Sequence, residues 1–166
     1  EPIDGAASVV SKYLEDGYLH DYISKQGGAT DVHCHIEFRS GTIKFMSYRD
    51  PHIGRTLDIY DQASVFLGQS ILTTETLPDE AIHAIIGTIA ELDGSAPQPN
   101  KIGWDFLIEY IREETSDIRQ LWRDQILNTS RIDFVEFIKH MANLEDPSIA
   151  VIASNEAIQR ANATSG

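Results

Sequence analysis

Two histidines flank the only cysteine of the chain, in the order His33-Cys34-His35. Imidazole nitrogens and thiolates are ligands that zinc prefers, and a thiolate is also a nucleophile. If this segment is a strand, His33 and His35 project from one face together with Asp31, and Cys34 projects from the other. A zinc site needs at least one further protein ligand, which the sequence does not fix. Two interpretations stay open: a metal site on His33 and His35, or an ordinary strand.

A β-hairpin is the element expected to position these residues. The runs Ala29–Phe38 and Thr42–Tyr48 have the composition of strands, and Arg39-Ser40-Gly41 between them has the composition of a turn. Cys34 then faces the core, so we expect a buried, unreactive thiol. Asp50, just after the second strand, is expected to cap the turn that follows it.

Apolar residues at helical spacing predict helices around this hairpin. The expected ranges are Gly5–Lys25 with a break at Gly17, Ile53–Leu67, Leu77–Leu92, Gly103–Glu113, Ser116–Leu127, Ser130–Leu144 and a last helix from Asn155 to Ala161. Trp104 and Trp122 lie on two of these helices and are expected to anchor the core or a domain interface. The near-continuous apolar run Ser148–Ala153 predicts a buried central strand.

This order of elements predicts an α+β fold, namely a two-layer sheet-and-helix domain with a mostly antiparallel sheet and several helices on one face. Residues 1–166 are expected to form a single domain. Three strands make a thin sheet for this number of helices. We therefore expect further strands of the same sheet to precede residue 1.

The composition is that of a globular chain with a core, since 42% of the 166 residues are apolar. The formal net charge of -13 argues against nucleic acid and anionic membrane surfaces as partners, because both require clustered Lys and Arg. No apolar run approaches the roughly 18 residues needed to span a bilayer. A negative surface either keeps a protein soluble or attracts basic peptides, and both interpretations stay open.

A longer pattern runs from Leu19 to His52. Leu19 and Ile23 lie on a helix that ends at Gly27-Gly28-Ala29, and the second strand ends in Ser47-Tyr48-Arg49-Asp50-Pro51-His52. This order resembles the C-terminal part of the presequence protease and falcilysin branch of the inverzincin zinc metallopeptidases, which are relatives of pitrilysin and insulysin. In that branch a helix ends in a pattern close to L-x-x-x-I-R-x-x-G-G-A-Y-G, and two strands and S-Y-R-D-P-N follow. The likeness continues to residue 161 and so covers almost the whole chain.

The resemblance implies a large clamshell peptidase whose two homologous halves enclose a chamber for short unfolded peptides. Its zinc is held by an H-x-x-E-H motif in the N-terminal half, where the Glu acts as general base. That motif does not occur in these 166 residues, so we expect the chain neither to be a hydrolase on its own nor to hold a cofactor. The implied partners are the N-terminal half of the same protein and unstructured peptides, and the implied location is a mitochondrion or plastid-type organelle.

Two positions depart from the family pattern. In the family the C-terminal half contributes an Arg and a Tyr that hydrogen-bond the substrate and stabilise the oxyanion. Ser24 and Thr30 occupy these positions, and neither supplies a guanidinium group or a phenol. By the resemblance, the candidate substrate-contact residues are Gly27, Gly28, Ala29, Thr30 and Arg49.

The leading interpretation is a C-terminal chamber-wall domain of a zinc metalloendopeptidase that degrades short unfolded peptides and is not catalytic alone. The alternative is a pseudoenzyme, a non-catalytic relative that binds peptides or serves as a scaffold. It follows from the resemblance, because Ser24 and Thr30 stand where the family has its substrate-contact Arg and Tyr, while the rest of the pattern matches. A third interpretation is a free-standing metal-binding protein built on His33 and His35.

Overall fold

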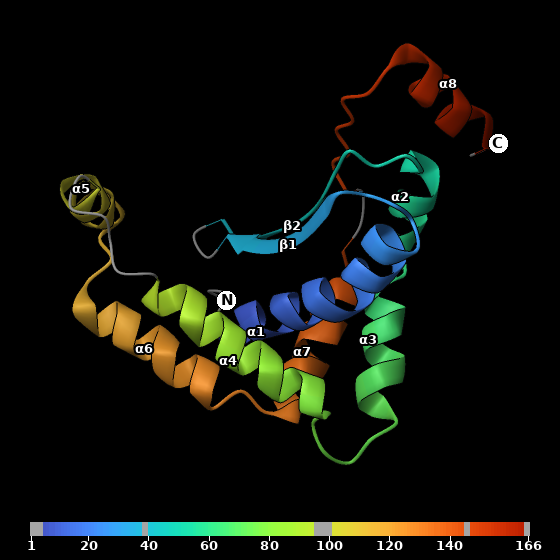
Figure 1. The fold of residues 1–166 in the computed structure, drawn as a ribbon. Helices are drawn as coiled ribbons and strands as arrows, with labels where there is room; N and C mark the ends of the chain where they lie inside the picture. Colours follow the sequence, from blue (N-terminus) through green and yellow to red (C-terminus); the bar gives the residue numbers. More distant parts are fainter. Residues whose placement is uncertain (1–4, 38–39, 95–100, 145–146, 165–166) are drawn as a thin grey trace.

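The computed structural model describes residues 5–37, 40–94, 101–144 and 147–164. A helical segment leads into a hairpin, and further helices follow (Figure 1). The elements are α1 (Gly5–Tyr13), η1 (Leu14–Lys25), β1 (Asp31–Glu37), β2 (Thr42–Tyr48), α2 (Ile53–Asp61), α3 (Ala63–Leu72), α4 (Asp79–Asp93), α5 (Ile102–Arg112), α6 (Ser116–Leu127), α7 (Arg131–Ala142) and α8 (Asn155–Thr164). The expected helices are therefore present with slightly shifted ends, although the range Ile53–Leu67 belongs to two helices, α2 and α3, that meet at Gln62.

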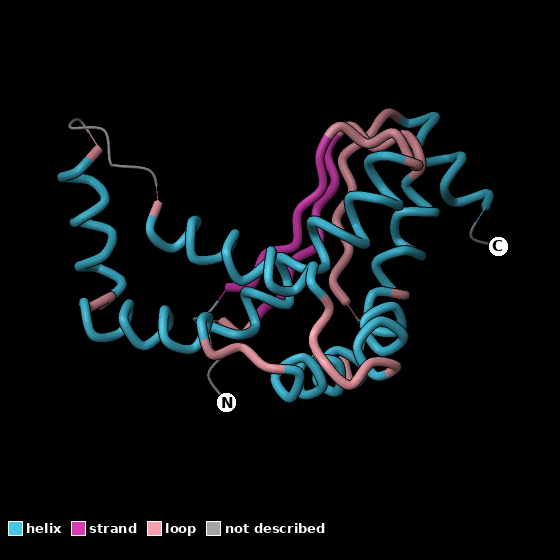
Figure 2. The backbone as a smooth tube through the Cα atoms, turned by 60° about the horizontal axis from the view of Figure 1, so that its bottom comes forward, coloured by secondary structure: helices cyan, strands magenta, loops and turns pink. Residues whose placement is uncertain are grey.

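The predicted hairpin is confirmed. β1 and β2 pair antiparallel, from Asp31 opposite Tyr48 to Glu37 opposite Thr42. Residues 38 and 39, which the sequence assigned to the strand end and the turn, lie outside the described residues. The inner face of β1 is buried against α1 and η1, while its outer face is exposed. Figure 2 shows the two strands running together along one side of the helices.

The core lies between the inner face of the hairpin and the helices. Tyr18 stacks on Phe66 with ring centroids 4.4 Å apart, and Phe45 stacks on Tyr60 at 5.1 Å. The largest fully buried side chains are Phe134, Leu14, Leu19, Ile23, Leu67, Ile71, Ile126, Val9 and Val10. Burying an aliphatic side chain of this size contributes about 1.5–3 kcal/mol. Val32 and Cys34 of β1 belong to the same buried cluster, which therefore holds the hairpin against α1 and η1.

The first helix continues through Gly17 and changes its hydrogen bonding instead of breaking there. Leu14–Lys25 is a π-helix, in which backbone bonds join residues five apart. The bond from the Gln26 amide to the Asp21 carbonyl, 3.1 Å, continues this pattern at its end. Buried residues at Leu14 and Leu19 follow a five-residue repeat, which π geometry aligns on one face. The hydrophobic pattern thus favours a wider helix than the one predicted.

The segment Ser148–Ala153 is not the buried central strand that its apolar run predicts. It forms no strand, and Ile149, Val151 and Ile152 are exposed. A strand needs a neighbouring strand to pair with, and within the described residues the sheet consists of β1 and β2 only. The segment instead leads to α8, which packs on α2.

The sheet is antiparallel, as expected, but it is much smaller than expected, because the described chain is mainly helical and its sheet is a single hairpin. Each helix has a strong local pattern, whereas a wider sheet requires strands that the described residues do not form. An α+β arrangement with a small antiparallel layer and helices packed against its inner face describes the fold (Figure 1).

Candidate functional site

The turn between η1 and β1 holds most of the candidate contact residues. Two nested backbone bonds close it: Gly28 N–H donates to the Ser24 carbonyl at 2.9 Å, and Ala29 N–H donates to the Ile23 carbonyl at 3.1 Å. Gly28 has φ of 80°, which glycine adopts without steric cost. A Cβ atom on Gly27 would lie 2.5 Å from the Ile23 carbonyl oxygen. The backbone of the turn therefore requires both glycines.

The Ser24 side chain belongs to this turn. Its hydroxyl donates to the carbonyl oxygen of Ala29 at 3.0 Å, and the residue is half-buried. The hydroxyl thus supplies a hydrogen-bond donor to the Ala29 carbonyl and stabilises the turn. A side chain held in this way fastens the end of η1 to the start of β1.

Thr30 and Arg49 lie at the same end of the hairpin. The Thr30 amide donates to the Tyr48 carbonyl at 3.0 Å, which joins the turn to the residue that precedes Arg49. Both side chains are exposed, and the Arg49 guanidinium lies 5.4 Å from the centre of the Tyr48 ring. Arg49 has φ of 52°, a left-handed conformation that turns the chain sharply out of the strand. The structure therefore brings Thr30 and Arg49 together.

Asp50 has the capping role that the sequence predicts. Its Oδ1 accepts a hydrogen bond from the His52 amide at 2.8 Å. Its Oδ2 is buried and has no hydrogen-bond partner among the described residues. The cap orders the chain between β2 and α2 directly after Arg49, at the end of the hairpin where Thr30 and Arg49 lie.

His33 and His35 lie on the exposed face of β1, as the strand alternation predicts. His33 Nε2 is 3.2 Å from Asp31 Oδ2, and its Nδ1 is 3.7 Å from Glu15 Oε2. His35 lies opposite Lys44, whose positive charge disfavours a cation beside it. The described part of the chain contains no group of three or more His, Cys, Asp or Glu side chains arranged to hold a metal ion. These residues therefore do not fit a zinc site.

Glu15 is a site residue that sequence reasoning missed. Its Oε2 accepts a 2.7 Å hydrogen bond from the Cys34 amide, at the edge of β1 that faces away from β2. Its Oε1 lies 3.3 Å from the Lys12 ammonium group, which also contacts Asp16 and Glu91. Burial alone would lower the pKa of Lys12, but the three carboxylates outweigh it and raise that pKa above its ordinary value. The Glu15 carboxylate thus ties η1 to the edge of β1 through a residue 19 positions away, and local sequence patterns carry no signal for such a contact.

The Cys34 thiol is buried, as expected. Its residue is 6% exposed, within the core cluster beneath the hairpin. Burial raises the pKa of the thiol far above its ordinary range, and the nearby charge of Glu15 adds to the effect. A thiol that stays protonated is a poor nucleophile and a poor metal ligand.

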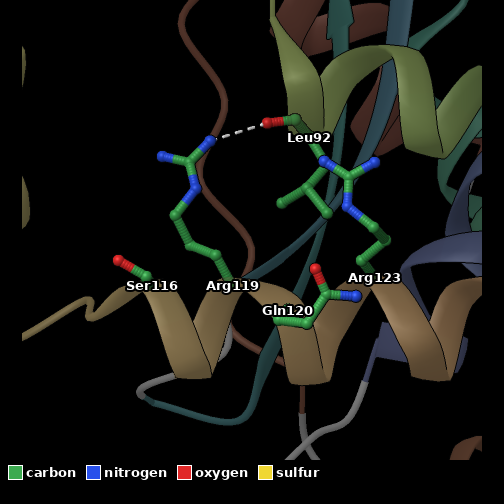
Figure 3. A pocket seen from close by; sticks show the side chains of 5 residues that line it. All are labelled: Leu92, Ser116, Arg119, Gln120 and Arg123. Carbon is green, nitrogen blue, oxygen red and sulfur yellow. Dashed lines mark hydrogen bonds between the residues drawn. The ribbon is translucent and has the colours of Figure 1, made fainter.

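A shallow cavity of about 280 Å³ lies between the end of α4 and the start of α6 and is lined by Leu92, Ser116, Arg119, Gln120 and Arg123 (Figure 3). Arg119 donates to the Leu92 carbonyl at 2.9 Å and to Glu109 of α5 at 2.5 Å. Arg123 forms a two-bond pair with Asp93. Both guanidinium groups are therefore already paired within the chain. The cavity is a packing contact between helices α4, α5 and α6.

The outer face of the hairpin is the surface best suited to a ligand. It combines the exposed Tyr48 ring and Met46 with the two histidines and the contact end at Thr30 and Arg49. Such a face can donate hydrogen bonds to an extended peptide and pack against its side chains.

In the described residues, no helix is both long and apolar enough to cross a bilayer.

The chain is similar to known proteins over most of its length. A family model described as the PreP C-terminal domain matches residues 1–155. Presequence protease 1, chloroplastic/mitochondrial, of Arabidopsis thaliana is 38% identical over 161 residues, which cover 96% of this chain. Protein HypA of Clostridium perfringens is 31% identical over 93% of the chain, and the mitochondrial presequence protease of Kluyveromyces lactis is 28% identical over 92%. The chain spans only 14% of the Arabidopsis protein and 15% of each of the other two.

Proposed function

This chain belongs to the family of PreP C-terminal domains, and on that premise we propose that residues 1–166 form one chamber-wall domain of a zinc metalloendopeptidase that degrades short unfolded peptides. The domain is not catalytic alone. Zinc and the general base belong to the N-terminal half of the same protein, which supplies the hydrolytic water when the metal is bound. The residues of this chain bind and orient the peptide.

The open outer face of the hairpin is the observation that carries this proposal. Thr30 and Arg49 are both exposed at its end, where the Thr30 amide donates to the Tyr48 carbonyl and the Arg49 guanidinium lies 5.4 Å from the centre of the Tyr48 ring. The turn below them is held rigid by the Gly28 and Ala29 amide bonds and by the Ser24 hydroxyl. A rigid backbone with exposed polar ends suits an extended peptide, whose own amides seek partners.

The second candidate is a non-catalytic relative that binds peptides or serves as a scaffold. The Ser24 hydroxyl is already bonded to Ala29, and the Thr30 side chain is short, so neither side chain replaces the Arg and Tyr that the family resemblance assigns there. Loss of one oxyanion donor costs on the order of a hundred-fold in rate. A parent enzyme with this domain is therefore expected to be slow if it cleaves peptides.

Zinc content and peptide cleavage of the full-length protein separate these candidates. We expect zinc in the purified protein, cleavage of a fluorogenic unfolded peptide, and loss of cleavage on treatment with a chelator. Tight peptide binding without cleavage at saturating zinc would favour the non-catalytic relative instead. The variant His33→Ala is expected to keep the full zinc content, and a loss of one zinc per chain would support the metal site on His33 and His35.

We propose a mitochondrion or a plastid as the location, since the names of the related presequence proteases of Arabidopsis thaliana and Kluyveromyces lactis place those proteins in mitochondria or chloroplasts. Imaging of the full-length protein fused at its C-terminus to a fluorescent protein tests this. Signal spread through the cytosol, with no overlap with mitochondria or plastids, would contradict it.

A further inference from the structure

Helix α5 (Ile102–Arg112) exposes an unusually wide apolar surface. The exposed fractions are 64% for Trp104, 66% for Phe106 and 83% for Tyr110. Three aliphatic residues of the same helix, Ile102, Leu107 and Ile111, are also exposed. At 3.6 residues per turn these six side chains span about 200° of the helix circumference, slightly more than half. Glu109 and Arg112 lie on the remaining side, called here the polar strip, which also carries the partly buried Ile108.

The polar strip, and not the apolar surface, attaches α5 to the rest of the described chain. Glu109 forms an ion pair with Arg119 of α6 at 2.5 Å, and Arg119 in turn donates to the last turn of α4 at Leu92. Figures 1 and 2 both show α5 standing apart from the layer of α1, α4 and α6. A surface helix normally does the opposite, with its apolar side turned to the core. The aromatic residues of α5 therefore remain exposed.

The composition of this surface is that of a protein interface. Trp and Tyr are the residues most enriched among those that dominate binding energy, and here they accompany Phe, Leu and Ile on one helix. Isolated exposed apolar residues are ordinary, but a contiguous set on one helix marks a contact surface.

The width of the apolar surface indicates the shape of what covers it. A flat surface or a single facing helix covers less than half of a helix, so this surface requires a concave partner that encloses α5. Two cavities of the described chain do not offer one to a second copy, because one is lined by the engaged Arg119 and Arg123 and the other by α5 and Glu114. The relatives, by contrast, have about six-sevenths of their length outside the part that matches this chain.

The charge at one end of α5 adds a second criterion. Glu113 and Glu114 follow the helix directly, where its own carbonyl groups already make the end negative. Arg112 lies 3.8 Å from Glu114 and offsets only part of this charge. A partner groove with Lys or Arg at that end complements it.

We propose that α5 inserts into an apolar groove with a basic end, formed by a part of the same polypeptide outside residues 1–166. The contact holds this domain in place within the longer protein. The proposal rests on the chain being one domain of such a protein, but not on that protein cleaving peptides.

Photo-crosslinking in the full-length protein tests this directly. Benzoylphenylalanine replaces Phe106, and in a control it replaces Ile132 of α7, which is 69% exposed and lies on another part of the molecule. Light and heavy isotope-labelled proteins are mixed before irradiation, and cross-linked peptides are identified by mass spectrometry. We expect benzoylphenylalanine at position 106 to cross-link to residues of the same polypeptide that lie outside residues 1–166. Each cross-linked pair is then entirely light or entirely heavy. Links between light and heavy chains would overturn the proposal, and so would links confined to residues 1–166 or no links at all.

Hydrogen exchange gives an independent measure. The double variant Trp104→Ser/Phe106→Ser in the full-length protein is expected to raise amide exchange in α5 by at least about ten-fold and to deprotect one remote segment. The matched control Val65→Ser/Ile132→Ser removes two comparably exposed apolar side chains from α3 and α7 and is expected to leave α5 unchanged. An α5 that already exchanges rapidly in the wild-type protein would overturn the proposal. Neither readout depends on peptidase activity, so failure of the α5 proposal is distinguishable from failure of the proposed function.

Discussion

The Ser24 hydroxyl donates a hydrogen bond to the carbonyl oxygen of Ala29, 3.0 Å away, across the turn that joins η1 to β1. The family resemblance assigns to this position an Arg that reaches the substrate. In this chain the side chain fastens the turn instead. The resemblance thus predicts a long cationic side chain at a position where this chain has the short hydroxyl of Ser24.

Replacing Ser24 with Ala is expected to weaken this turn by about 1 kcal/mol, the typical contribution of such a hydrogen bond. Thr30→Ala is the matched control, because the Thr30 side chain is exposed. The measurement is the free energy of local opening, from hydrogen exchange at the Ala29 and Thr30 amides of the full-length protein. Equal effects of the two substitutions would show that the Ser24 bond does not hold the turn.

Gly27→Ala is expected to destabilise the domain by more than about 1 kcal/mol, because the new Cβ would lie 2.5 Å from a backbone oxygen. Gly17→Ala is the matched control within the same helical segment, since apart from its chain neighbours and the helix's own backbone no atom lies within 4 Å of a Cβ there. It is expected to stabilise η1 by about 0.5–1 kcal/mol. Thermal unfolding of the full-length protein measures both, and a tolerated Gly27→Ala would mean that the turn has another conformation.

The Cys34 thiol is expected to resist alkylation. Burial raises its pKa far above the ordinary range, so almost no thiolate is present near pH 8. Peptide mapping after treatment with iodoacetamide is expected to show Cys34 unmodified in the native protein and fully modified in denaturant. Rapid modification of Cys34 under native conditions would contradict the buried position beneath the hairpin.

Lys12 is expected to stabilise the fold until strongly alkaline pH. Its pKa is raised above the ordinary 10.5, so its contribution is complete below that value and is lost only as pH rises through the higher folded-state pKa. Lys12→Met should therefore lower the unfolding temperature by a constant amount between about pH 7 and pH 10, and by less above that range. A difference that already shrinks near pH 8 would mean that the contacts with Glu15, Asp16 and Glu91 do not hold Lys12 charged.

Local patterns predicted the helices and the hairpin well, because each depends on residues close in sequence. The alternation in β1 correctly places His33 and His35 outside and Cys34 inside. The segment Ser148–Ala153 has an equally clear pattern but forms no strand, since a strand depends on a partner elsewhere.

Long-range contacts explain what the sequence could not predict about the site. The bond between Glu15 and the Cys34 amide joins residues 19 apart, and no spacing rule connects them. Trp104 was expected in a core or at a domain interface, and its 64% exposure excludes the core of the described residues. The pattern shows that α5 is apolar, but only the ion pair from Glu109 to Arg119 shows which side faces outward.

The peptide-contact role of the turn is the central claim. Its most direct test is kcat/KM of the full-length protein for an unfolded peptide, measured for the wild type and for the double variant Ser24→Arg/Thr30→Tyr. The wild type is expected to cleave slowly, and the variant at least about ten-fold faster, because it returns two donors to the oxyanion. An unchanged kcat/KM, with the fold of the variant intact by hydrogen exchange, would contradict the assignment of Ser24 and Thr30 to the substrate-contact positions.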